Sequence, residues 1–502
     1  MVRDYLKAIK ENVDVRKNLI ALRAEIKENQ GRHALLYALE NQFQIFYDLL
    51  KAEDPKIRKN AALILGRLGV QESLSKLYEA YEKEKTLFVR GSYLTAIKEL
   101  DYRSYVGRMK EQLAALLDMP KDTDNKKHIL EEIRLLKEMI ITIEGRKKHT
   151  FTGYHKTARM LLLTNRNFRE ITMNQVKSYR PKLYSAGVMI KTDELEEVLK
   201  IRTFSELLFV LEDLTVLRSN GESHVDTMAK EFASRIWESS LMEFLKERHK
   251  EDMPFFFRLE CKAKMDLKKK SSFTRKLAEY LEEQSEGKLQ NSTSHYEIEL
   301  RMVENKNGDF NFMVKLFTLP DTRFSYRKQA LATSIQPVNA ALAMALADKY
   351  LTEGAQVLDP FCGVGTMLVE RSKFRKTGDM YGIDIFGKGI EAARRNTEFA
   401  REQINYINRD FFDFTHDYLF DEIVSNMPRV MGKKTEADIR TLYCKFWKKA
   451  AIHLKEQGIL LLYCYDKKIL LDTCPRNRYE ILEEFEISKK EDAYCFVLRR
   501  HE

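Results

Sequence analysis

The residue types best suited to binding a small ligand follow a short apolar run that ends in an acid, Val357-Leu358-Asp359. The next residues are Pro360-Phe361-Cys362-Gly363-Val364-Gly365-Thr366, and the stretch from Met367 to Arg371 has helix-forming character. The pattern predicts a strand, a tight turn and the start of a helix. Glycines in such a turn let backbone N–H groups approach a ligand closely, and the helix start offers further unpaired donors.

Three ligand classes use a turn of this kind, and two of them do not fit. A phosphate-binding loop requires Gly-Lys-Ser/Thr, whereas Gly365 is followed by Thr366 and Met367. The dinucleotide fingerprint requires a third glycine three residues after the second, where this chain has Leu368. What remains is the turn that holds S-adenosylmethionine (SAM) in Rossmann-like methyltransferases.

Acids and amides also end the apolar runs that follow. Met380–Ile385 carries Asp384, 25 residues after Asp359, which suits a ribose-binding carboxylate roughly 20 residues beyond the glycine turn. The next two runs end at Asp410-Phe411 and at Asn426-Met427-Pro428-Arg429. Strands that alternate with helices predict a parallel doubly wound sheet with ligands at its carboxyl edge. Either acid alone could equally be a helix cap, but their joint placement at strand ends favours a ligand site.

The motifs resemble those of the THUMP-linked RNA methyltransferases, which modify guanine N2. The resemblance rests on Asp-Pro-Phe-Cys-Gly-x-Gly-Thr, then Gly-Ile-Asp, then a strand that ends in Asn-x-Pro. Ala332-Thr333-Ser334-Ile335-Gln336-Pro337 resembles the segment that those enzymes place just before the catalytic domain, and Leu199–Thr203 also resembles a part of them. The resemblance covers roughly the last 350 residues.

The resemblance implies metal-free methyl transfer, in which the enzyme chiefly positions two reactants. Asp384 would accept hydrogen bonds from the ribose hydroxyls, and Asp410 with the Phe411 backbone would meet the adenine. Asp359 would orient the turn or contact the ligand amino group. The expected cofactor-binding set is Ser334, Pro337, Asp359, Phe361, Gly363, Gly365, Thr366, Asp384, Ile385, Asp410 and Phe411. Cys362 is expected to be a small packing residue, since no histidine motif accompanies it.

Asn426-Met427-Pro428-Arg429 is the expected catalytic site. In amino-methyltransferases the pattern is Asp or Asn, then x-Pro, then an aromatic residue that stacks on the flipped base. The amide oxygen and a backbone carbonyl accept hydrogen bonds from the acceptor amine. This chain has Arg429 where the aromatic is expected. Arginine can stack on a base, but it also brings a cation near a sulfonium, a repulsion of several kcal/mol in a closed site.

Length and composition predict a multidomain protein with a polyanionic partner. The chain has 502 residues, a length that suggests three or four domains. Its net charge of +10 favours a nucleic acid as the partner, although many basic proteins bind none. Its six cysteines lack any Cys-x-x-Cys pattern, so we expect reduced thiols and no metal site. The N-terminus is charged from the start, and no apolar run approaches 18 residues. We therefore expect a soluble, cytoplasmic protein.

Residues 1–145 read as helices with few glycines or prolines. Arg16-Lys17-Asn18 recurs as Arg58-Lys59-Asn60, and Ile57-Arg58 recurs loosely as Val89-Arg90. A period of roughly 30–45 residues suggests HEAT-like helical repeats, with an irregular helical bundle as the alternative. This segment is expected to be a contact surface for a protein or an RNA. Gly145–His149 is a basic hinge to the next domain.

The middle of the chain predicts two α+β segments. Residues 146–248 show a β-α-β-α-β alternation that fits a ferredoxin-like domain, with its second strand expected over Leu183–Ile190. The segment ends in one long helix from Val225 to Arg248. Residues 249–320 resemble a THUMP domain, with a helix from Phe273 to Gln284 after a basic loop. Eight basic and two acidic residues lie between Arg258 and Lys276. The expected RNA-binding residues are Arg258, Lys262, Lys264, Lys268, Lys269, Lys270 and Arg275; a solvated charge run is the alternative.

Residues 321–502 are the expected methyltransferase domain, a Rossmann-like α/β fold whose seven-stranded sheet ends in an antiparallel pair. We predict a SAM-dependent RNA methyltransferase acting on a guanine exocyclic amine of tRNA or rRNA. Two alternatives stay open: a SAM- and RNA-binding factor without catalysis, and an amino-methyltransferase of DNA or protein. The particular RNA, the modified position, the partner of the helical arm and the oligomeric state do not follow from the sequence.

Overall fold

The computed structural model of the chain describes residues 2–40, 42–117, 126–144, 149–219, 224–251, 254–432 and 434–501. The chain divides into two compact units, Met1–Lys147 and Lys148–Glu502. Of the predicted hinge Gly145–His149, only His149 lies among the described residues. No helix in the described ranges is long and apolar enough to cross a membrane.

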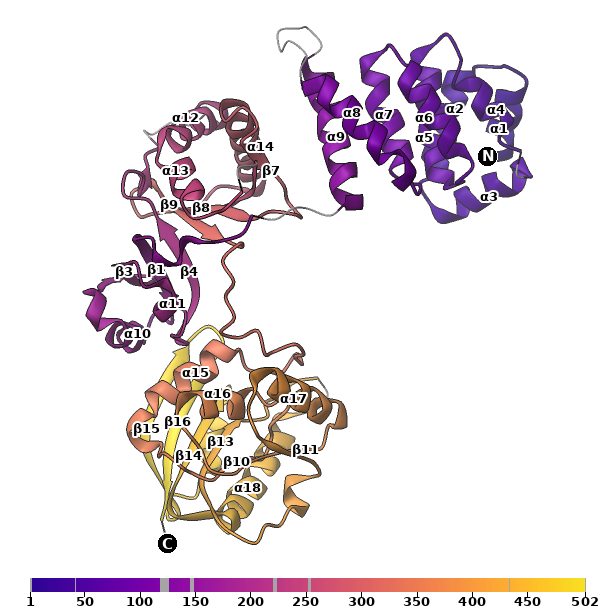
Figure 1. Cartoon of the computed structure of the whole chain (residues 1–502). Helices are drawn as coiled ribbons and strands as arrows, with labels where there is room; N and C mark the ends of the chain where they lie inside the picture. Colours follow the sequence, from indigo (N-terminus) through magenta and orange to yellow (C-terminus); the bar gives the residue numbers. More distant parts are fainter. Residues whose placement is uncertain are drawn as a thin grey trace. The chain divides into compact units, whose positions relative to one another are not determined.

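The N-terminal unit is built from α-helices (Figure 1). They are α1 (Val2–Lys10), α2 (Val15–Glu25), α3 (Asn29–Leu39), α4 (Gln44–Leu49), α5 (Pro55–Leu68), α6 (Ser73–Lys83), α7 (Leu87–Ile97), α8 (Val106–Leu117) and α9 (Lys126–Glu144). Local signals set the bounds of α5: the Asp54 carboxylate caps the Lys56 N–H at 2.8 Å, Pro55 occupies the first turn, and Gly69 ends the helix at φ 71°.

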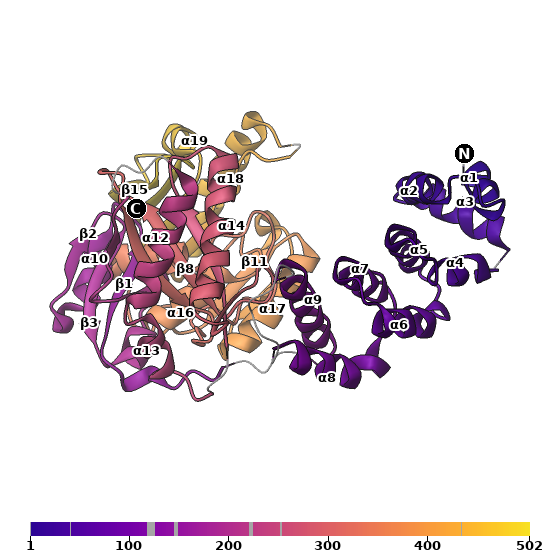
Figure 2. The same cartoon turned by 90° about the horizontal axis from the view of Figure 1, so that it is seen from above.

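Four of these helices, α2, α5, α7 and α9, pack in succession (Figure 2). They run parallel, because contacts join their early turns to early turns and their late turns to late turns. Lys59 lies over the Phe88 ring near the starts of α5 and α7, and Gly66 meets Ala96 near their ends. A Cβ at Gly66 would lie 2.5 Å from the Ala96 Cα, so glycine lets the two helices approach closely.

A buried charge network joins the helices of this unit. The Arg90 guanidinium pairs with the Glu132 carboxylate at 2.7 Å, and the Tyr81 hydroxyl donates to the same carboxylate at 2.6 Å. All three side chains are buried. Removing one partner would leave a charge without compensation, so the network connects α6, α7 and α9 tightly.

The first half of the second unit contains one nine-stranded sheet in the order β2-β3-β1-β4-β9-β8-β6-β7, with β5 paired to β9. Strands from both predicted middle segments therefore join one sheet, through the β4–β9 pair. The strands are β1 (Ala158–Thr164), β2 (Lys182–Tyr184), β3 (Gly187–Thr192), β4 (Phe204–Val210), β5 (Val216–Leu217), β6 (Phe255–Lys262), β7 (Leu289–Asn291), β8 (Ile298–Glu304) and β9 (Phe310–Leu316). The helices are α10 (Arg169–Gln175), α11 (Leu195–Val198), α12 (Val225–Glu238), α13 (Leu241–Lys246) and α14 (Leu267–Gln284).

Three predictions about this half were wrong. The expected long helix from Val225 to Arg248 is two helices, α12 and α13, separated at Ser239-Ser240. The Asp213 carboxylate accepts hydrogen bonds from the Ser240 N–H and hydroxyl, both at 2.7 Å, and so fixes the break. The expected strand Leu183–Ile190 is the hairpin β2–β3. Helix α14 begins at Leu267, because Asp266 caps the Lys269 N–H, so the three lysines lie on a helix and not on a loop.

The second half of the unit contains the predicted seven-stranded sheet, in the order β12-β11-β10-β13-β14-β16-β15. The strands are β10 (Val357–Asp359), β11 (Met380–Asp384), β12 (Asn405–Asn408), β13 (Phe420–Asn426), β14 (Leu454–Cys464), β15 (Tyr479–Ser488) and β16 (Ala493–Arg500). β10 to β14 are parallel, and β16 is antiparallel to both neighbours. This confirms the predicted sheet and its antiparallel end.

Helices cover both faces of this sheet (Figure 1). Alternate strand residues face opposite sides: Val357 and Leu461 pack with the helices α15 to α17, whereas Leu358 and Leu460 pack with α18 and α19. The helices are α15 (Pro337–Leu346), α16 (Thr366–Phe374), α17 (Gly387–Ala400), α18 (Glu436–His453) and α19 (Lys467–Thr473). The carboxyl ends of β10 to β14 meet at one edge, where a ligand is expected.

Candidate active site

The turn after β10 has the conformation that the sequence predicts. Gly363 and Gly365 have φ angles of 53° and 82°, in the left-handed region that favours glycine. A Cβ at Gly365 would lie 2.3 Å from the Tyr406 hydroxyl, so no larger residue fits there. A Cβ at Gly363 would meet no atom within 4 Å, so the backbone of this residue faces open space. The turn thus leads into α16 with an accessible backbone at Gly363.

Asp359 holds this turn against the neighbouring strand. Its carboxylate accepts a hydrogen bond from the Ser425 hydroxyl at 2.6 Å and one from the Phe361 N–H at 3.1 Å. Burial raises the pKa of Asp359 to about 7, and the nearby charge of Asp384 acts in the same direction. Of the two roles expected from the sequence, the geometry supports orientation of the turn.

The end of β11 places a carboxylate beside the glycine turn. Asp384 accepts hydrogen bonds from the Gly363 N–H and the Phe386 N–H, each at 2.9 Å. Each carboxylate oxygen keeps a further lone pair for a ligand hydroxyl. Ile385 follows and is 69% exposed, an unusual position for a large apolar residue and one that suits a ring of a bound ligand.

Asp410 and Phe411 follow β12 at the same edge. The Asp410 carboxylate accepts a hydrogen bond from the Phe412 N–H at 2.9 Å and caps a short 3-10 helix. Phe411 is buried, and its ring lies 6.0 Å from that of Phe361. The side chain of Phe411 therefore belongs to the core, and only its backbone remains for the adenine contact expected from the sequence.

Asn426 ends β13 with one amide atom unpaired. Its Nδ2 donates to the Thr333 carbonyl at 3.2 Å, whereas its Oδ1 is buried without a partner. A buried acceptor without a partner is costly, so this oxygen indicates a missing donor. The neighbouring backbone is fixed: the Met427 N–H donates to the Tyr463 carbonyl at 2.8 Å, and the Tyr443 hydroxyl donates to the Pro428 carbonyl at 2.9 Å. The Met427 side chain is buried in the core.

The segment from Leu331 to Pro337 reaches the same edge. The Leu331 N–H donates to the Ser334 hydroxyl at 2.9 Å, and Pro337 is the buried first residue of α15. The Asn396 side chain holds the start of the segment, because it accepts from the Gln329 N–H at 3.1 Å and donates to the Gln329 carbonyl at 3.0 Å. The Thr333 contact with Asn426 thus brings the predicted upstream segment to the predicted catalytic residue.

Arg429 is stacked on an aromatic ring that the sequence analysis did not select. Its guanidinium carbon lies 4.1 Å from the centroid of the Tyr465 ring, at the end of β14. Burial raises the pKa of the Tyr465 hydroxyl, and the Arg429 charge opposes that shift. Ser425 and Thr333 were also missed. Tyr465 lies just past a strand end, so the rule that selected the other residues applies to it as well.

The predicted RNA-binding residues lie on β6, on α14 and on the segment between them. Arg258 on β6 pairs with the Glu299 carboxylate and stacks 4.2 Å from the Tyr296 ring centroid, so its charge is already compensated. Lys262 ends β6 and Lys264 follows it, whereas Lys268, Lys269 and Lys270 lie in the first turn of α14. Arg275 pairs with Glu279 along α14 at 3.0 Å.

Comparison with known proteins shows which class of enzyme the C-terminal domain resembles. Residues 325–492 match the family UPF0020, described as "RMKL-like, methyltransferase domain". The chain is 25% identical over 165 residues to the ribosomal protein L11 methyltransferase of Dictyoglomus turgidum, covering 32% of this chain and 50% of that protein. It is 28% identical over 137 residues to the tRNA (guanine(10)-N2)-dimethyltransferase of Methanothermobacter thermautotrophicus, covering 26% of this chain and 39% of that protein. The chain thus spans half or less of the length of these relatives.

A solved structure shares the fold of the second unit. TrmN from Thermus thermophilus aligns with a TM-score of 0.52 and 18% sequence identity over 68% of this chain and 99% of that chain. Together these matches show a methyltransferase domain with a Rossmann-like fold, and its methyl donor is S-adenosyl-L-methionine.

The residues at the carboxyl edge fit this cofactor. A ligand can approach the backbone of Gly363 from its open side. The spare lone pairs of Asp384 can accept hydrogen bonds from ligand hydroxyls, and the exposed Ile385 can contact a ligand ring. The Thr366 hydroxyl is buried without a partner at the start of α16, as is the Asn426 Oδ1 at the end of β13. Burial raises the pKa of Cys362 well above its ordinary value, which suits the expected packing role. Among the described residues, no group of His, Cys, Asp or Glu side chains is arranged to hold a metal ion.

Proposed function

We propose that the protein methylates an exocyclic amine, guanine N2, of a base in tRNA or rRNA. The observation that carries this proposal is the unpaired, buried Oδ1 of Asn426 at the end of β13. An exocyclic NH2 supplies the donor that this oxygen lacks. The named guanine-N2 activity of the relative from M. thermautotrophicus agrees with an amine acceptor.

The residues of the site act by positioning. When bound, SAM supplies a methyl carbon already activated by a sulfonium, so no metal or strong base is required. Asn426 Oδ1 accepts one amine N–H and aims the nitrogen lone pair at that carbon. The C–N bond forms as the C–S bond breaks, and the amine releases one proton to solvent. The Thr333 carbonyl accepts a hydrogen bond from the Asn426 amide and so fixes its orientation. Because the amide is already oriented, less entropy is lost when the acceptor base is aligned.

Arg429 and Tyr465 form the proposed platform for the acceptor base. The Tyr465 ring covers one face of the guanidinium at 4.1 Å, and the other face can stack on a base. A cation over an aromatic face is stabilised by about 0.5–2 kcal/mol. In this stack the positive charge of Arg429 stays within the platform and is not directed at the sulfonium of SAM. Arginine can therefore take the place of the usual aromatic residue.

RNA binding is proposed to involve the lysines at the start of α14, in the segment 249–320 that resembles a THUMP domain. Lys268 is exposed, and it has no ion pair among the described residues. The helical unit is proposed to be a short HEAT-like array, because α2, α5, α7 and α9 pack in parallel succession. A cytoplasmic location agrees with an RNA substrate.

Radiolabelled SAM with total RNA from a strain that lacks the gene tests the proposal. The full-length wild type should label RNA, and Asn426→Ala should reduce the rate at least about 100-fold while SAM affinity stays nearly unchanged. Asn405→Ala, at the start of the edge strand β12 and so at the opposite edge of the same sheet, is the matched control and should keep full activity. In a whole-cell extract of the same strain, label that survives ribonuclease but not protease would favour a protein acceptor, as in the L11 methyltransferase relative. No label at all would favour a binding factor without catalysis.

A further inference from the structure

The starts of four helices in the N-terminal unit lie along one edge. Parallel packing of α2, α5, α7 and α9 follows from contacts at both ends of each pair. Near the starts, Lys59 lies over Phe88, whose ring is 6.3 Å from that of His128. Toward the ends, Arg67 reaches the carbonyl of Lys27, and Lys98 pairs with Glu138. Figure 2 shows the four helices in one row.

This edge carries cations that are not paired with acids in the described part of the unit. We call them the basic edge: Arg16, Lys17, Lys56, Lys59, Lys85 and Lys127. Within the described ranges, none of the six forms a recorded ion pair. The starts of the helices add the positive ends of four aligned dipoles. Positive potential therefore extends along the whole row.

Three cations near the other ends of these helices have partners within the fold. Arg67 donates to the carbonyls of Ile26 and Lys27, and Arg32 donates to the Leu68 carbonyl at 2.9 Å. Lys98 pairs with Glu138 at 2.6 Å. These side chains satisfy helix ends or neighbouring acids. The contrast indicates that the basic edge serves an external partner and not the fold.

Acids near the basic edge compensate it only in part. Glu84 is buried and paired with Arg58 at 2.8 Å, and Asp54 caps its own helix. Asp14 and Glu53 are exposed. Glu131, four residues after Lys127, pairs with Arg134. Among the residues that the structure describes, the six cations therefore outnumber the acids near them, and the edge keeps a net positive charge.

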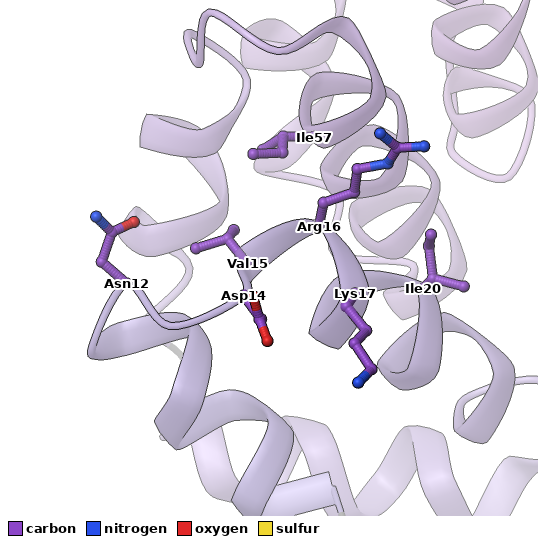
Figure 3. Close-up of a pocket in the computed structure, with 7 residues that line it drawn as sticks. All are labelled: Asn12, Asp14, Val15, Arg16, Lys17, Ile20 and Ile57. Atoms are coloured by element: carbon purple, nitrogen blue, oxygen red, sulfur yellow. The ribbon is translucent and has the colours of Figure 1, made fainter.

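An open hollow lies on the same edge, at the start of α2 (Figure 3). It has a volume of about 510 Å³ and is lined by Asn12, Asp14, Val15, Arg16, Lys17, Ile20 and Ile57. Val15, Ile20 and Ile57 give it an apolar wall beside two cations. Ile20 is 51% exposed, and farther along the row Phe88 is 36% exposed. Apolar and aromatic surfaces between cations suit bases attached to a phosphate backbone.

We propose that the basic edge binds the phosphate backbone of the substrate RNA, with bases lying in the hollow and on Phe88. This inference rests on the proposed RNA methyltransferase function and assigns the helical unit a part in substrate binding. Packed helices lie about 8–10 Å apart, so a row of four spans roughly 25–30 Å. A row of that length matches an extended polyanion and exceeds any single small anion.

Full-length protein and fluorescently labelled, unmodified tRNA provide the test. Backbone contacts are independent of sequence, so tRNA serves as the probe whichever RNA is the substrate. The triple variant Lys17→Gln, Lys56→Gln, Lys59→Gln should weaken binding about tenfold or more, and the slope of log K against log salt should fall by about 2. The matched control is Lys27→Gln, Lys76→Gln, Lys98→Gln, which removes the same charge away from the edge. It should change binding and slope little.

Each outcome of this experiment is informative. An equal loss in both triple variants would show general attraction and overturn the proposal. Unchanged binding in the edge variant would overturn it as well and would leave the edge to an acidic protein. If wild type bound RNA normally in that case, the proposed methyltransferase function would stand. If wild type bound no RNA, both proposals would fail. Unchanged SAM affinity and helical circular dichroism in the variants confirm that they fold.

Discussion

The catalytic domain and the N-terminal helical unit both bury an ion pair but leave different polar groups unpaired. In the catalytic domain, Arg371 pairs with Glu422 at 2.7 Å, and the buried atoms without a partner include the Asn426 Oδ1 and the Thr366 hydroxyl. In the helical unit, Arg90 pairs with Glu132, and the cations of the basic edge form no recorded ion pair among the described residues. The parallel strands of the catalytic domain bring their carboxyl ends together at one edge, whereas the parallel helices of the other unit lie in a row. The first arrangement can aim one atom, and the second can hold a long polyanion.

Breaking the two buried ion pairs should give the largest effects and should separate the two units. Arg371→Met leaves the buried Glu422 carboxylate without its compensating cation, which should cost about 3–5 kcal/mol. Arg371 also joins α16, which follows the glycine turn, to β13, which ends in Asn426, so SAM binding should weaken with stability. Arg90→Met should destabilise the helical unit by a similar amount. Urea unfolding followed by circular dichroism, with calorimetric SAM titration, measures both.

The comparison requires that the Arg90 variant keep its SAM affinity, because the two units are separate compact bodies. Loss of SAM binding in Arg90→Met equal to that in Arg371→Met would show that the units do not fold independently.

The next effect concerns the pH dependence of the catalytic domain. Burial raises the pKa of Asp359 to about 7 from its ordinary 3.8, so the folded state binds a proton that the unfolded state releases. Stability from this group is therefore lost as pH rises from about 4 to about 7, up to roughly 4 kcal/mol. Asp359→Asn should remove this loss and be relatively more stable at pH 8 than at pH 5.

Fluorescence of the buried Trp447 in a Trp237→Phe background reports unfolding of this domain alone. A stability difference between Asp359→Asn and its parent that is the same at pH 5 and pH 8 would refute the raised pKa. The Asn side chain can still accept from Ser425 and Phe361, so the turn should keep its geometry.

Asp384→Ala should weaken SAM binding roughly ten- to a hundredfold, because an unmade hydrogen bond to a charged group costs about 1.5–3 kcal/mol. Isothermal calorimetry with SAM measures this change. Asp348→Ala, an exposed acid of the same domain paired with Arg375, is the control. Equal affinity in Asp384→Ala and wild type would remove the end of β11 from the cofactor site.

The smallest effect is expected at Arg429. Arg429→Tyr should preserve or raise methyl transfer if the guanidinium only replaces a stacking ring. Arg429→Ala should lower it about fivefold through loss of about 1 kcal/mol of stacking, the lower end of the usual range. A fall in Arg429→Tyr to the level of Arg429→Ala would instead assign Arg429 to a phosphate next to the base. Single-turnover rates with labelled SAM distinguish the two.

The sequence predicted the catalytic sheet well because its signals are local. Apolar runs such as Val357–Asp359 and Met380–Ile385 end in acids or glycines, and the strands follow those limits closely. The middle sheet was harder: Leu183–Ile190 is apolar without a strong turn signal, yet Ser185-Ala186 separates two strands. The start of α14 was missed because three lysines hid a helix that Asp266 caps.

Site residues at the end of a single strand could be predicted, but contacts between residues of different strands could not. Asp359, Asp384 and Asn426 all follow from position at a strand end. That Ser425 satisfies Asp359, or that Tyr465 supports Arg429, depends on which strands become neighbours. The basic edge likewise required the parallel packing of four helices, which the repeat suggested but did not define.

Nucleoside mass spectrometry of tRNA and rRNA from strains with and without the gene tests the central claim most directly. The account predicts that N2-methylguanosine disappears from one or more positions when the gene is lost. It also predicts return of the mark on complementation with wild type or Asn405→Ala, but not with Asn426→Ala. An unchanged set of methylated nucleosides in both RNA classes would contradict the assignment of Asn426 to an RNA amine.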